Sequence, residues 1–225
     1  MSLSTAPEAV FFDLDGTFAD TAADLAAAAN SLRADRGMDP LPLERLRPMA
    51  SHGARGMLGE ALGLAPGDDA YAATVELFLQ RYEAALCVHT VVFDGLWPLV
   101  DAIEARGVAW GIVTNKAMRF AAPLCRQLGI EGRAAAVVGG DTTPHAKPHP
   151  APLLHAAELA RVDAAQCVYV GDDLRDVQAG RAAGMRTVAV SYGYNGKADP
   201  PEAWGADHLV RAPHELHAVL LELAG

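Results

Sequence analysis

The chain has 225 residues, enough for one large domain or two small ones around a full core. Half of its residues are apolar and a fifth are charged, as in ordinary globular proteins, and no apolar run is long enough to cross a bilayer. The formal net charge of −10 argues against a partner that presents a phosphate backbone, such as nucleic acid, and we expect no membrane partner.

The sequence also bears on the cellular compartment. The N-terminal residues lack the basic start and the apolar core of a secretion signal. Cys87, Cys125 and Cys167 show no CxxC spacing, and we interpret them as reduced core residues. We therefore expect a cytoplasmic protein.

The first predicted element is a short strand over Val10–Phe12 that ends in two carboxylates and a turn. The motif after it reads Asp13-Leu14-Asp15-Gly16-Thr17. A turn that begins at Gly16 can bring the second carboxylate over the first, and two crowded acids repel each other unless a divalent cation lies beside them. The alternative is an ordinary turn in which Asp15 or Thr17 caps the next helix.

The segment that follows has a helical pattern, with little strand signal before Val108. Helices are predicted over Asp20–Arg36, Glu44–Leu62 and Ala70–Leu86. We expect residues 20–94 to form a helical cap over the active site, with hinges near Asp20 and near Gly95. Residues 1–19 and 95–225 would then form the core. The alternative is a helical layer packed against the sheet.

Strands and helices alternate in the rest of the chain. Apolar runs predict strands over Val108–Val113, Ala135–Val138, Cys167–Val170 and Thr187–Val190. Helical patterns lie beside them, over Leu96–Arg106, Ala117–Leu128, Pro150–Ala160 and Asp176–Ala183. This alternation predicts an α/β fold with a doubly wound parallel sheet, right-handed crossovers and ligands beyond the carboxyl ends of the strands.

Polar residues follow two of these strands. Thr114 and Asn115 come directly after Val113, and their hydroxyl and amide suit a phosphoryl oxygen because both donate hydrogen bonds without bulk. Lys147 precedes Pro148, which restrains the backbone and would hold the ammonium beside a carboxylate and a phosphate oxygen. Each signal is weak alone, because Thr and Asn are common in turns and most lysines are solvated.

The strand that ends at Val170 is followed by Gly171 and an acidic cluster. Asp172, Asp173 and Asp176 would repel one another without a cation. Mg²⁺ fits this cluster better than zinc, because the oxygens come without Cys or His. Gly171 permits a tight turn that favours Asp172 as the direct ligand, whereas Asp173 and Asp176 could instead stabilise a helix N-terminus.

These four motifs occur after four successive strands, and with them the chain resembles the haloacid dehalogenase superfamily of phosphohydrolases over essentially its whole length. The resemblance implies a Rossmann-like core and a helical cap inserted between the first and second motifs. It also implies hydrolysis of a phosphomonoester with Mg²⁺ through an aspartyl-phosphate intermediate. DxDGT with a downstream Gly-Asp-Asp is specific for the superfamily but does not identify the substrate.

The resemblance also implies a catalytic role for five residues. Asp13 would attack phosphorus, and Asp15 would protonate the leaving alkoxide and later take a proton from water. Thr114 and Asn115 would hold the transferred group. Lys147 would offset the negative charge on the nucleophile and on the phosphate.

The metal would be held in the same region. As the resemblance implies, Mg²⁺ would bind the side chains of Asp13 and Asp172 and the backbone carbonyl of Asp15. Asp173 and Asp176 would lie behind these ligands and orient metal-bound water or the catalytic lysine.

Substrate specificity is expected from the cap. In the segment from Ser51 to Gly56, we expect Ser51, His52, Gly53 and Arg55 to contact the substrate, and Arg55 suits a bidentate contact with a carboxylate. Arg119, just past the second motif, is another candidate for an anion. The alternative is a solvated helix N-terminus at Arg55 and an ordinary loop residue at His52.

Within the superfamily the chain is most similar to phosphoglycolate phosphatases, which implies 2-phosphoglycolate as the substrate. Other segments, Trp204-Gly205-Ala206-Asp207 among them, resemble a branch that dephosphorylates N-acetylmuramic acid 6-phosphate in cell-wall recycling. A β-phosphoglucomutase-like isomerase shares the nucleophile. A receiver-type signalling domain shares the chemistry but lacks the cap and the second Asp. We expect a small phosphorylated metabolite as the partner of a monomer or a homodimer.

Overall fold

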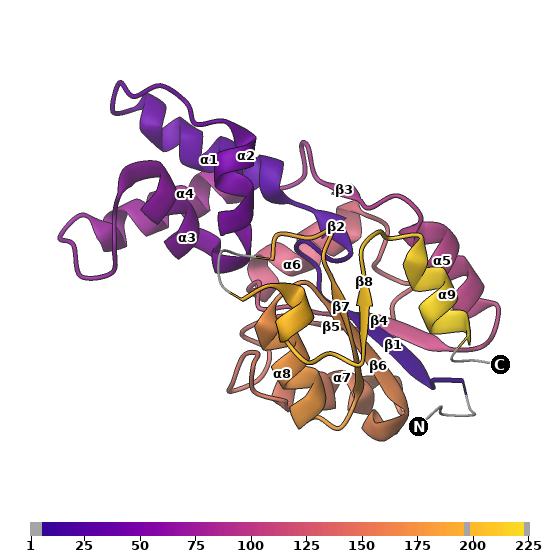
Figure 1. Cartoon of the computed structure of the whole chain (residues 1–225). Helices are drawn as coiled ribbons and strands as arrows, with labels where there is room; N and C mark the ends of the chain where they lie inside the picture. Colours follow the sequence, from indigo (N-terminus) through magenta and orange to yellow (C-terminus); the bar gives the residue numbers. More distant parts are fainter. Residues whose placement is uncertain (1–5, 196–198, 223–225) are drawn as a thin grey trace.

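The computed structural model describes residues 6–195 and 199–222. The first five residues, which carry part of the expectation about secretion, lie outside these ranges. Figure 1 shows a central sheet with helices packed around it and a group of helices, α1 to α4, set apart from the sheet. Within the described ranges, no helix is both long enough and apolar enough to span a lipid bilayer.

Six parallel strands form the sheet in the order β5-β4-β1-β6-β7-β8. Their bounds are β1 (Ala9–Phe12), β4 (Ala109–Val113), β5 (Ala136–Val138), β6 (Cys167–Gly171), β7 (Arg186–Val190) and β8 (His208–Val210). In the middle of the sheet, Phe12 of β1 pairs with Ile112 on one side and with Val170 on the other. The prediction of a doubly wound parallel sheet is confirmed. The apolar runs predicted it correctly because strands that are buried on both faces are apolar along their whole length.

Alternate residues of β1 point into two separate cores. Val10 and Phe12 join the cluster formed with α5 (Leu96–Glu104), α6 (Met118–Gln127) and α9 (Glu215–Glu222). Ala9 and Phe11 join the cluster formed with α7 (Ala151–Ala160) and α8 (Leu174–Ala182). Because strand side chains alternate between faces, one short strand anchors both helical layers.

The structure differs from the sequence expectation at the C-terminal end of the sheet and within the expected helix over residues 44–62. Two elements near the C-terminus were not predicted from the sequence: the short strand β8 and the helix α9. The helix expected over residues 44–62 is divided into α2 (Leu43–Leu46), the 3-10 helix η1 (Arg47–His52) and α3 (Gly53–Leu62). The division falls where Pro48 removes a backbone donor and where Gly53 adopts a φ of 55°, which favours glycine.

The helices α1 (Ala22–Ala34), α3 and α4 (Tyr71–Ala84) pack against one another. The chain reaches and leaves this group through two short strands, β2 (Ala19–Asp20) and β3 (Val91–Val92). They pair antiparallel, with Ala19 opposite Val92. The two connections between the α1–α4 group and the sheet therefore lie side by side, which the sequence did not indicate.

Candidate active site

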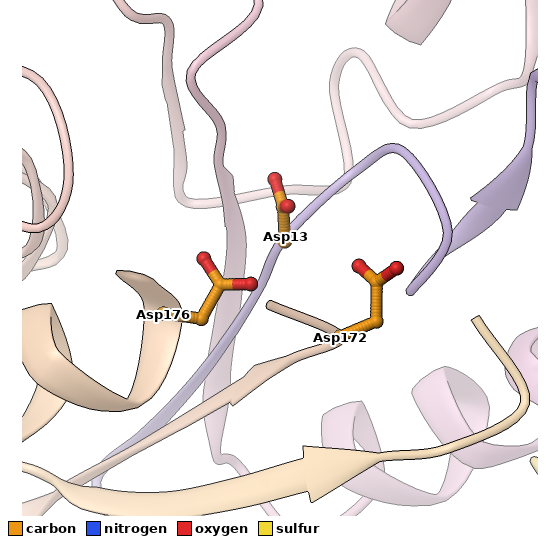
Figure 2. Close-up of side chains that lie close together, drawn as sticks. All are labelled: Asp13, Asp172 and Asp176. Atoms are coloured by element: carbon orange, nitrogen blue, oxygen red, sulfur yellow. The ribbon is translucent and has the colours of Figure 1, made fainter. Parts of the chain in front are cut away.

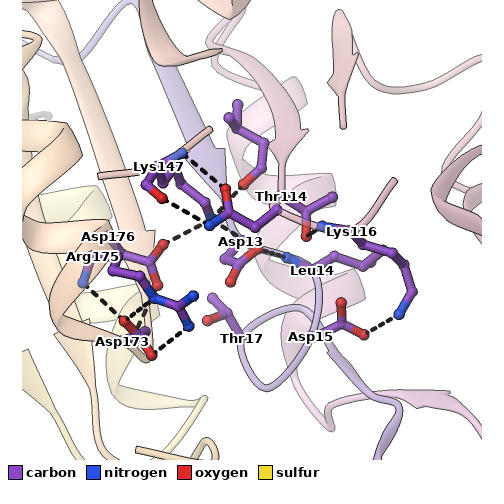
Figure 3. A network of polar contacts seen from close by, with 12 residues as sticks. Asp13, Leu14, Asp15, Thr17, Thr114, Lys116, Lys147, Asp173, Arg175 and Asp176 are labelled. Atoms are coloured by element: carbon purple, nitrogen blue, oxygen red, sulfur yellow. Dashed lines mark hydrogen bonds and ion pairs between the residues drawn. The ribbon is translucent and has the colours of Figure 1, made fainter. Parts of the chain in front are cut away.

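The predicted motifs meet at the carboxyl ends of the central strands. Asp13 follows β1, Thr114 follows β4 and Asp172 follows β6, and these strands are neighbours in the sheet. The residues after them therefore lie along one edge, and Figure 3 shows the polar network that results. A cavity of about 360 Å³ covers this edge, with walls from the core and from the α1–α4 group.

Three carboxylates form an acidic cluster at this edge. Asp13, Asp172 and Asp176 each place one carboxylate oxygen within 4.8 Å of the others (Figure 2). Asp172 accepts hydrogen bonds from the Thr17 hydroxyl at 2.9 Å and from the Tyr194 backbone N–H at 2.7 Å. These bonds hold its carboxylate against the other two acids.

The acidic cluster fits a divalent cation. Burial raises the pKa of Asp172 well above its ordinary value, and the charges of Asp13 and Asp176 add to this effect. A dication would reverse it, because it favours the ionised form of each acid. The backbone at Gly16 lies close to the Asp172 carboxylate. Gly16 has a φ of 82°, and a Cβ at this position would lie only 2.3 Å from Oδ2 of Asp172, so only glycine fits here. All of the donors are oxygens, which suits Mg²⁺.

Lys147 is buried between two of these acids. Its Nζ lies 3.0 Å from Oδ1 of Asp13 and 2.7 Å from Oδ1 of Asp176. It also donates to the Val113 carbonyl at 3.0 Å and to the Tyr169 hydroxyl at 2.7 Å. Burial opposes the charge, but the two carboxylates raise the pKa of Lys147, so this lysine stays protonated.

The side chain of Asn115 fixes the backbone of this lysine. Its Nδ2 donates to the Lys147 carbonyl, and its Oδ1 accepts from the Lys147 N–H, both at 2.9 Å. The amide expected to hold the transferred group is therefore engaged in positioning Lys147. Thr114 is also buried, and its Oγ1 accepts from the Lys116 N–H at 3.2 Å, which leaves the hydroxyl hydrogen for a ligand.

Asp15 points away from the acidic cluster and pairs with Lys116, for which the sequence indicated no role. Its Oδ1 accepts from the Thr21 hydroxyl at 2.5 Å and from Nζ of Lys116 at 2.9 Å. The Lys116 side chain is largely buried, and this desolvation opposes its charge, but Asp15 and Tyr82 together raise its pKa above the ordinary value. The signal in the sequence was the position of Lys116, one residue after Asn115.

Asp173 and Asp176 cap the N-terminus of α8. Asp173 accepts from the Arg175 N–H, and Asp176 accepts in return from the Asp173 N–H at 3.0 Å. Arg175 also grips the Asp173 carboxylate through Nε and Nη2, at 2.7 and 2.9 Å. Its Nη2 donates to the Ser51 carbonyl at 2.7 Å, so Arg175 joins the core to η1. No motif in the sequence indicated a role for Arg175.

The expected specificity residues divide into two groups. Ser51, His52 and Gly53 line the cavity. Arg55 and Arg119 do not line it, and both are exposed, with the Arg119 guanidinium over the Phe120 ring at 4.4 Å. The reason at Arg55 is helical geometry: two residues beyond Gly53, a side chain has turned by about 200° to the other side of α3.

The remaining cavity wall is largely apolar. Leu25 of α1, together with Phe78, Leu79 and Tyr82 of α4, forms its surface in the α1–α4 group, and Phe120 of α6 adds to it from the core. Each guanidinium or ammonium group that lines the cavity comes from the core: Lys116, Lys147 and Arg175. The site thus has a charged floor and an apolar roof.

Comparison with known proteins agrees with this arrangement. The model of the haloacid dehalogenase-like hydrolase family matches residues 7–184, and the chain belongs to this family. A phosphoglycolate phosphatase of Xanthomonas campestris pv. campestris is 47% identical over 210 residues, which cover 93% of this chain and 95% of the relative. The N-acetylmuramic acid 6-phosphate phosphatase of Pseudomonas putida is 42% identical over 212 residues, which cover 94% and 95%.

Solved structures show the same fold. The crystal structure of a protein described as a predicted phosphoglycolate phosphatase from Haemophilus somnus has a TM-score of 0.83 at 24% identity, covering 96% of this chain and 99% of that one. Together, the family and the curated relatives identify the chain as a phosphoric monoester hydrolase.

Proposed function

We propose that this phosphatase uses Mg²⁺ and hydrolyses a small carboxylated phosphomonoester through an aspartyl-phosphate on Asp13. The supporting observation is the position of Asp13 beside a buried lysine and two further acids. Its Oδ1 accepts from the Leu14 N–H at 2.8 Å and pairs with Lys147, so this oxygen is held in place. Oδ2 accepts no hydrogen bond from the described residues and is the attacking atom in this proposal.

Two steps complete the reaction. In the first, Oδ2 of Asp13 bonds to phosphorus, the bond from phosphorus to the ester oxygen breaks, and Asp15 gives its proton to that oxygen. In the second, water attacks phosphorus, Asp15 takes a proton from it, and inorganic phosphate leaves as the Asp13 carboxylate is restored. Lys116 and Thr21 hold Oδ1 of Asp15, which leaves its Oδ2 to carry the proton.

Bound Mg²⁺ would supply the positive charge that lets a phosphate dianion approach a carboxylate. The residues that would hold it are Asp13 and Asp172, through their side chains, and Asp15, through its backbone carbonyl. Asp176 would keep Lys147 in position, and Asp173 would keep Arg175 in position. Thr114 would donate its hydroxyl hydrogen to the transferred group.

We also propose that residues 20–94 act as a cap that opens and closes over the cavity. The paired strands β2 and β3 support this assignment, because two adjacent connections can act together as one hinge. The assembly that we propose is a monomer or a homodimer. A cytoplasmic location would suit a phosphorylated metabolite as the substrate.

The first candidate substrate is 2-phosphoglycolate, supported by the Xanthomonas relative at 47% identity. The second is N-acetylmuramic acid 6-phosphate, supported by the Pseudomonas putida relative and by the cavity itself. A two-carbon acid is small relative to a 360 Å³ cavity, whereas an N-acylated sugar acid would use more of this volume, and Phe78 and Phe120 offer apolar surface for its carbon skeleton.

The substrate experiment compares kcat/KM for phosphate release from 2-phosphoglycolate, N-acetylmuramic acid 6-phosphate and several sugar phosphates, with Mg²⁺ and with EDTA. Both carboxylated substrates should exceed the sugar phosphates, and EDTA should remove activity. Interconversion of sugar phosphates with little phosphate release would instead indicate a mutase. Activity that persists in EDTA would contradict the role of the metal.

The nucleophile is tested with Asp13→Asn. An amide at this position is a poor nucleophile, so phosphate release should fall by at least about 10³-fold while the thermal transition remains cooperative. Arg119→Gln is the matched control, because Arg119 is exposed and lies outside the cavity. Turnover by Asp13→Asn close to the wild-type rate would refute the assignment.

A further inference from the structure

Among the described residues, three Lys and Arg side chains line the cavity, and Arg175 is the most exposed of them. The Arg175 side chain is 37% exposed, against 8% for Lys116 and 2% for Lys147. Lys147 lies between two carboxylates, and Lys116 pairs with Asp15. An anionic part of a substrate therefore finds Arg175 more accessible than either lysine.

The guanidinium of Arg175 has donors left for a ligand. A guanidinium carries five N–H groups, and three of those in Arg175 have partners. Nε and Nη2 donate to the Asp173 carboxylate (Figure 3), and Nη2 also donates to the Ser51 carbonyl. Nη1 makes no hydrogen bond to any described residue, and it is not a buried atom. Its N–H groups are therefore accessible to an acceptor that enters the cavity.

Arg175 is held in place and stays charged. The two bonds to Asp173 fix the plane of the guanidinium, and the bond to Ser51 places it where the core meets η1 of the proposed cap. The hydrogen bond to Asp173 raises the pKa of Arg175 although desolvation opposes it, and the charges of Asp176 and Asp13 add a smaller rise. A cation that is already ordered loses little conformational entropy when it binds a ligand.

The location of Arg175 suits an anionic substituent on the alcohol part of the substrate. The phosphoryl group is assigned to Asp13 and Lys147 at the floor of the site, which leaves the rest of the cavity for the alcohol. Arg175 joins this floor to η1 through Ser51. Arg55, which was expected to bind a carboxylate, does not line the cavity. Arg175 is the guanidinium that does line it.

We propose that Nη1 of Arg175 binds a carboxylate on the alcohol part of the substrate and selects carboxylated phosphomonoesters over those that lack this group. This inference rests on the proposed phosphatase function and assigns its specificity for the carboxylate to one residue of the core. A hydrogen bond between a guanidinium and a carboxylate is charge-assisted and stronger than a neutral one. A substrate without the carboxylate leaves Nη1 to water and gains nothing from this contact.

The test uses two matched substrate pairs that differ in the carboxylate. One pair is N-acetylmuramic acid 6-phosphate with N-acetylglucosamine 6-phosphate, and the other is 2-phosphoglycolate with 2-hydroxyethyl phosphate. For the pair whose carboxylated member the wild type cleaves best, we compare kcat/KM of that member with kcat/KM of its partner. In Arg175→Gln this ratio should fall by at least about tenfold, mainly through KM, as expected for one charge-assisted hydrogen bond. Arg175→Lys keeps the charge but loses the planar donors, so its ratio should lie between those of Arg175→Gln and the wild type.

Arg181→Gln is the matched control, because Arg181 belongs to the same helix, is exposed and does not line the cavity. Its ratio should equal that of the wild type. In the Asp13→Asn background, Arg175→Gln should raise the Kd for the carboxylated substrate more than the Kd for its partner.

The alternative is that Arg175 only ties η1 to the core through the Ser51 carbonyl. Arg175→Gln would then lower kcat/KM for both members of a pair equally. A wild type that prefers the carboxylated member, together with an unchanged ratio in both Arg175 variants, would overturn this inference alone. A wild type that shows no such preference, or releases no phosphate from any of the four compounds, would instead overturn the proposed function.

Discussion

At the scale of single residues, Asp172 combines a structural and a functional demand. It is 1% exposed and lies beside Asp13 and Asp176, so its ionised form is disfavoured unless a cation is bound. Two hydrogen bonds, from Thr17 and Tyr194, nevertheless hold it in place. Asp172 thus lowers the stability of the metal-free protein, and a functional role at this position explains why an acid is present there.

Asp172→Asn should therefore raise the stability of the metal-free protein. The amide oxygen can accept from Tyr194, and the Thr17 hydroxyl can turn to accept from the amide N–H, so the hydrogen bonds survive while the repulsion is lost. We expect the Tm in EDTA to rise by about 2–4 °C, equivalent to roughly 1 kcal/mol. Thermal scans with and without Mg²⁺ check this result.

The same variant should lose activity and the response of Tm to Mg²⁺, which the wild type should show. Asp163→Asn, remote from the cluster at the start of a 3-10 helix, serves as the control. If the metal-free Tm of Asp172→Asn drops below that of the wild type, repulsion among the three carboxylates is not the dominant effect.

At the scale of elements, α1 is tied to the returning chain by one buried carboxylate. Asp24, 3% exposed, accepts from the N–H groups of Val88, His89 and Thr90 and from the Thr90 hydroxyl at 2.7 Å. These bonds hold the segment before β3 against the first turns of α1. They stiffen one end of the proposed cap next to its hinge.

Asp24→Asn should destabilise the protein by about 2–3 kcal/mol, because an amide N–H would face backbone donors and leave them unpaired. Urea titration gives the free energy of unfolding, and limited proteolysis should show faster cleavage near residues 85–92. Asp35→Asn, at the exposed end of α1, is the control and should change little. Cleavage at an unaltered rate would mean that Asp24 does not hold this segment.

Arg133, in the loop after α6, connects this loop to α5 through ion pairs with two acidic residues. It binds Asp101 at 2.6 Å and Glu104 at 2.7 Å, and its guanidinium lies 4.9 Å from the Trp97 ring centroid. Hydrogen bonds from Arg133 and, to a smaller extent, from Trp110 lower the pKa of Glu104, although desolvation opposes them. The ionised form of Glu104 is thus favoured in the folded state.

A lowered carboxyl pKa stabilises the fold above the unfolded value, about 4.3 for Glu, and this stability is lost as the pH falls through the folded value. Glu104→Gln should therefore cost stability at pH 7, by no more than about 1 kcal/mol because the group is partly exposed and screened. The difference from the wild type should shrink as the pH falls below the unfolded pKa and through the lowered folded pKa of Glu104. Urea titrations at several pH values measure it.

Glu131→Gln removes the fully exposed partner of Arg126 and gives the baseline for a surface ion pair. A difference between Glu104→Gln and the wild type that persists undiminished at low pH would show that packing, not charge, is responsible.

At the scale of the whole molecule, the net charge of −10 opposes the approach of an anionic substrate, while Lys116, Lys147 and Arg175 attract it only nearby. Raising the salt concentration from 0.01 to 0.15 M shortens the screening length from about 30 to about 8 Å. Long-range repulsion is screened over this interval, whereas contacts within the cavity are affected less.

At saturating Mg²⁺, kcat/KM for a dianionic substrate should therefore rise by about two- to threefold over this salt range. The measurement is initial phosphate release at several NaCl concentrations, with the conductivity matched in the Mg²⁺ stock. A steady decrease of kcat/KM with salt would show that the local positive field extends beyond the cavity and dominates the encounter.

Features of the fold and of the site that depend on residues close together in the chain could be predicted from the sequence, whereas features that depend on tertiary contacts could not. The four motifs and the alternation of strands and helices depend on neighbouring residues and on their spacing, so the parallel sheet and the edge where Asp13 and Asp172 meet were predictable. Boundaries were less so: the helix expected from Asp176 begins at Leu174, because Asp173 and Asp176 cap it together.

The sequence by itself determined the fold class, the family and the four motifs that carry Asp13, Thr114, Lys147 and Asp172, because apolar periodicity and motif spacing depend on residues close together in the chain. Only the tertiary structure decided how those side chains pair. It turned Arg55 outward, joined Lys116 to Asp15 and placed Tyr82 in the wall of the cavity. The physical reason is that a charged or polar side chain takes its partner from whatever residue the fold brings near, and spacing along the chain carries no record of that choice.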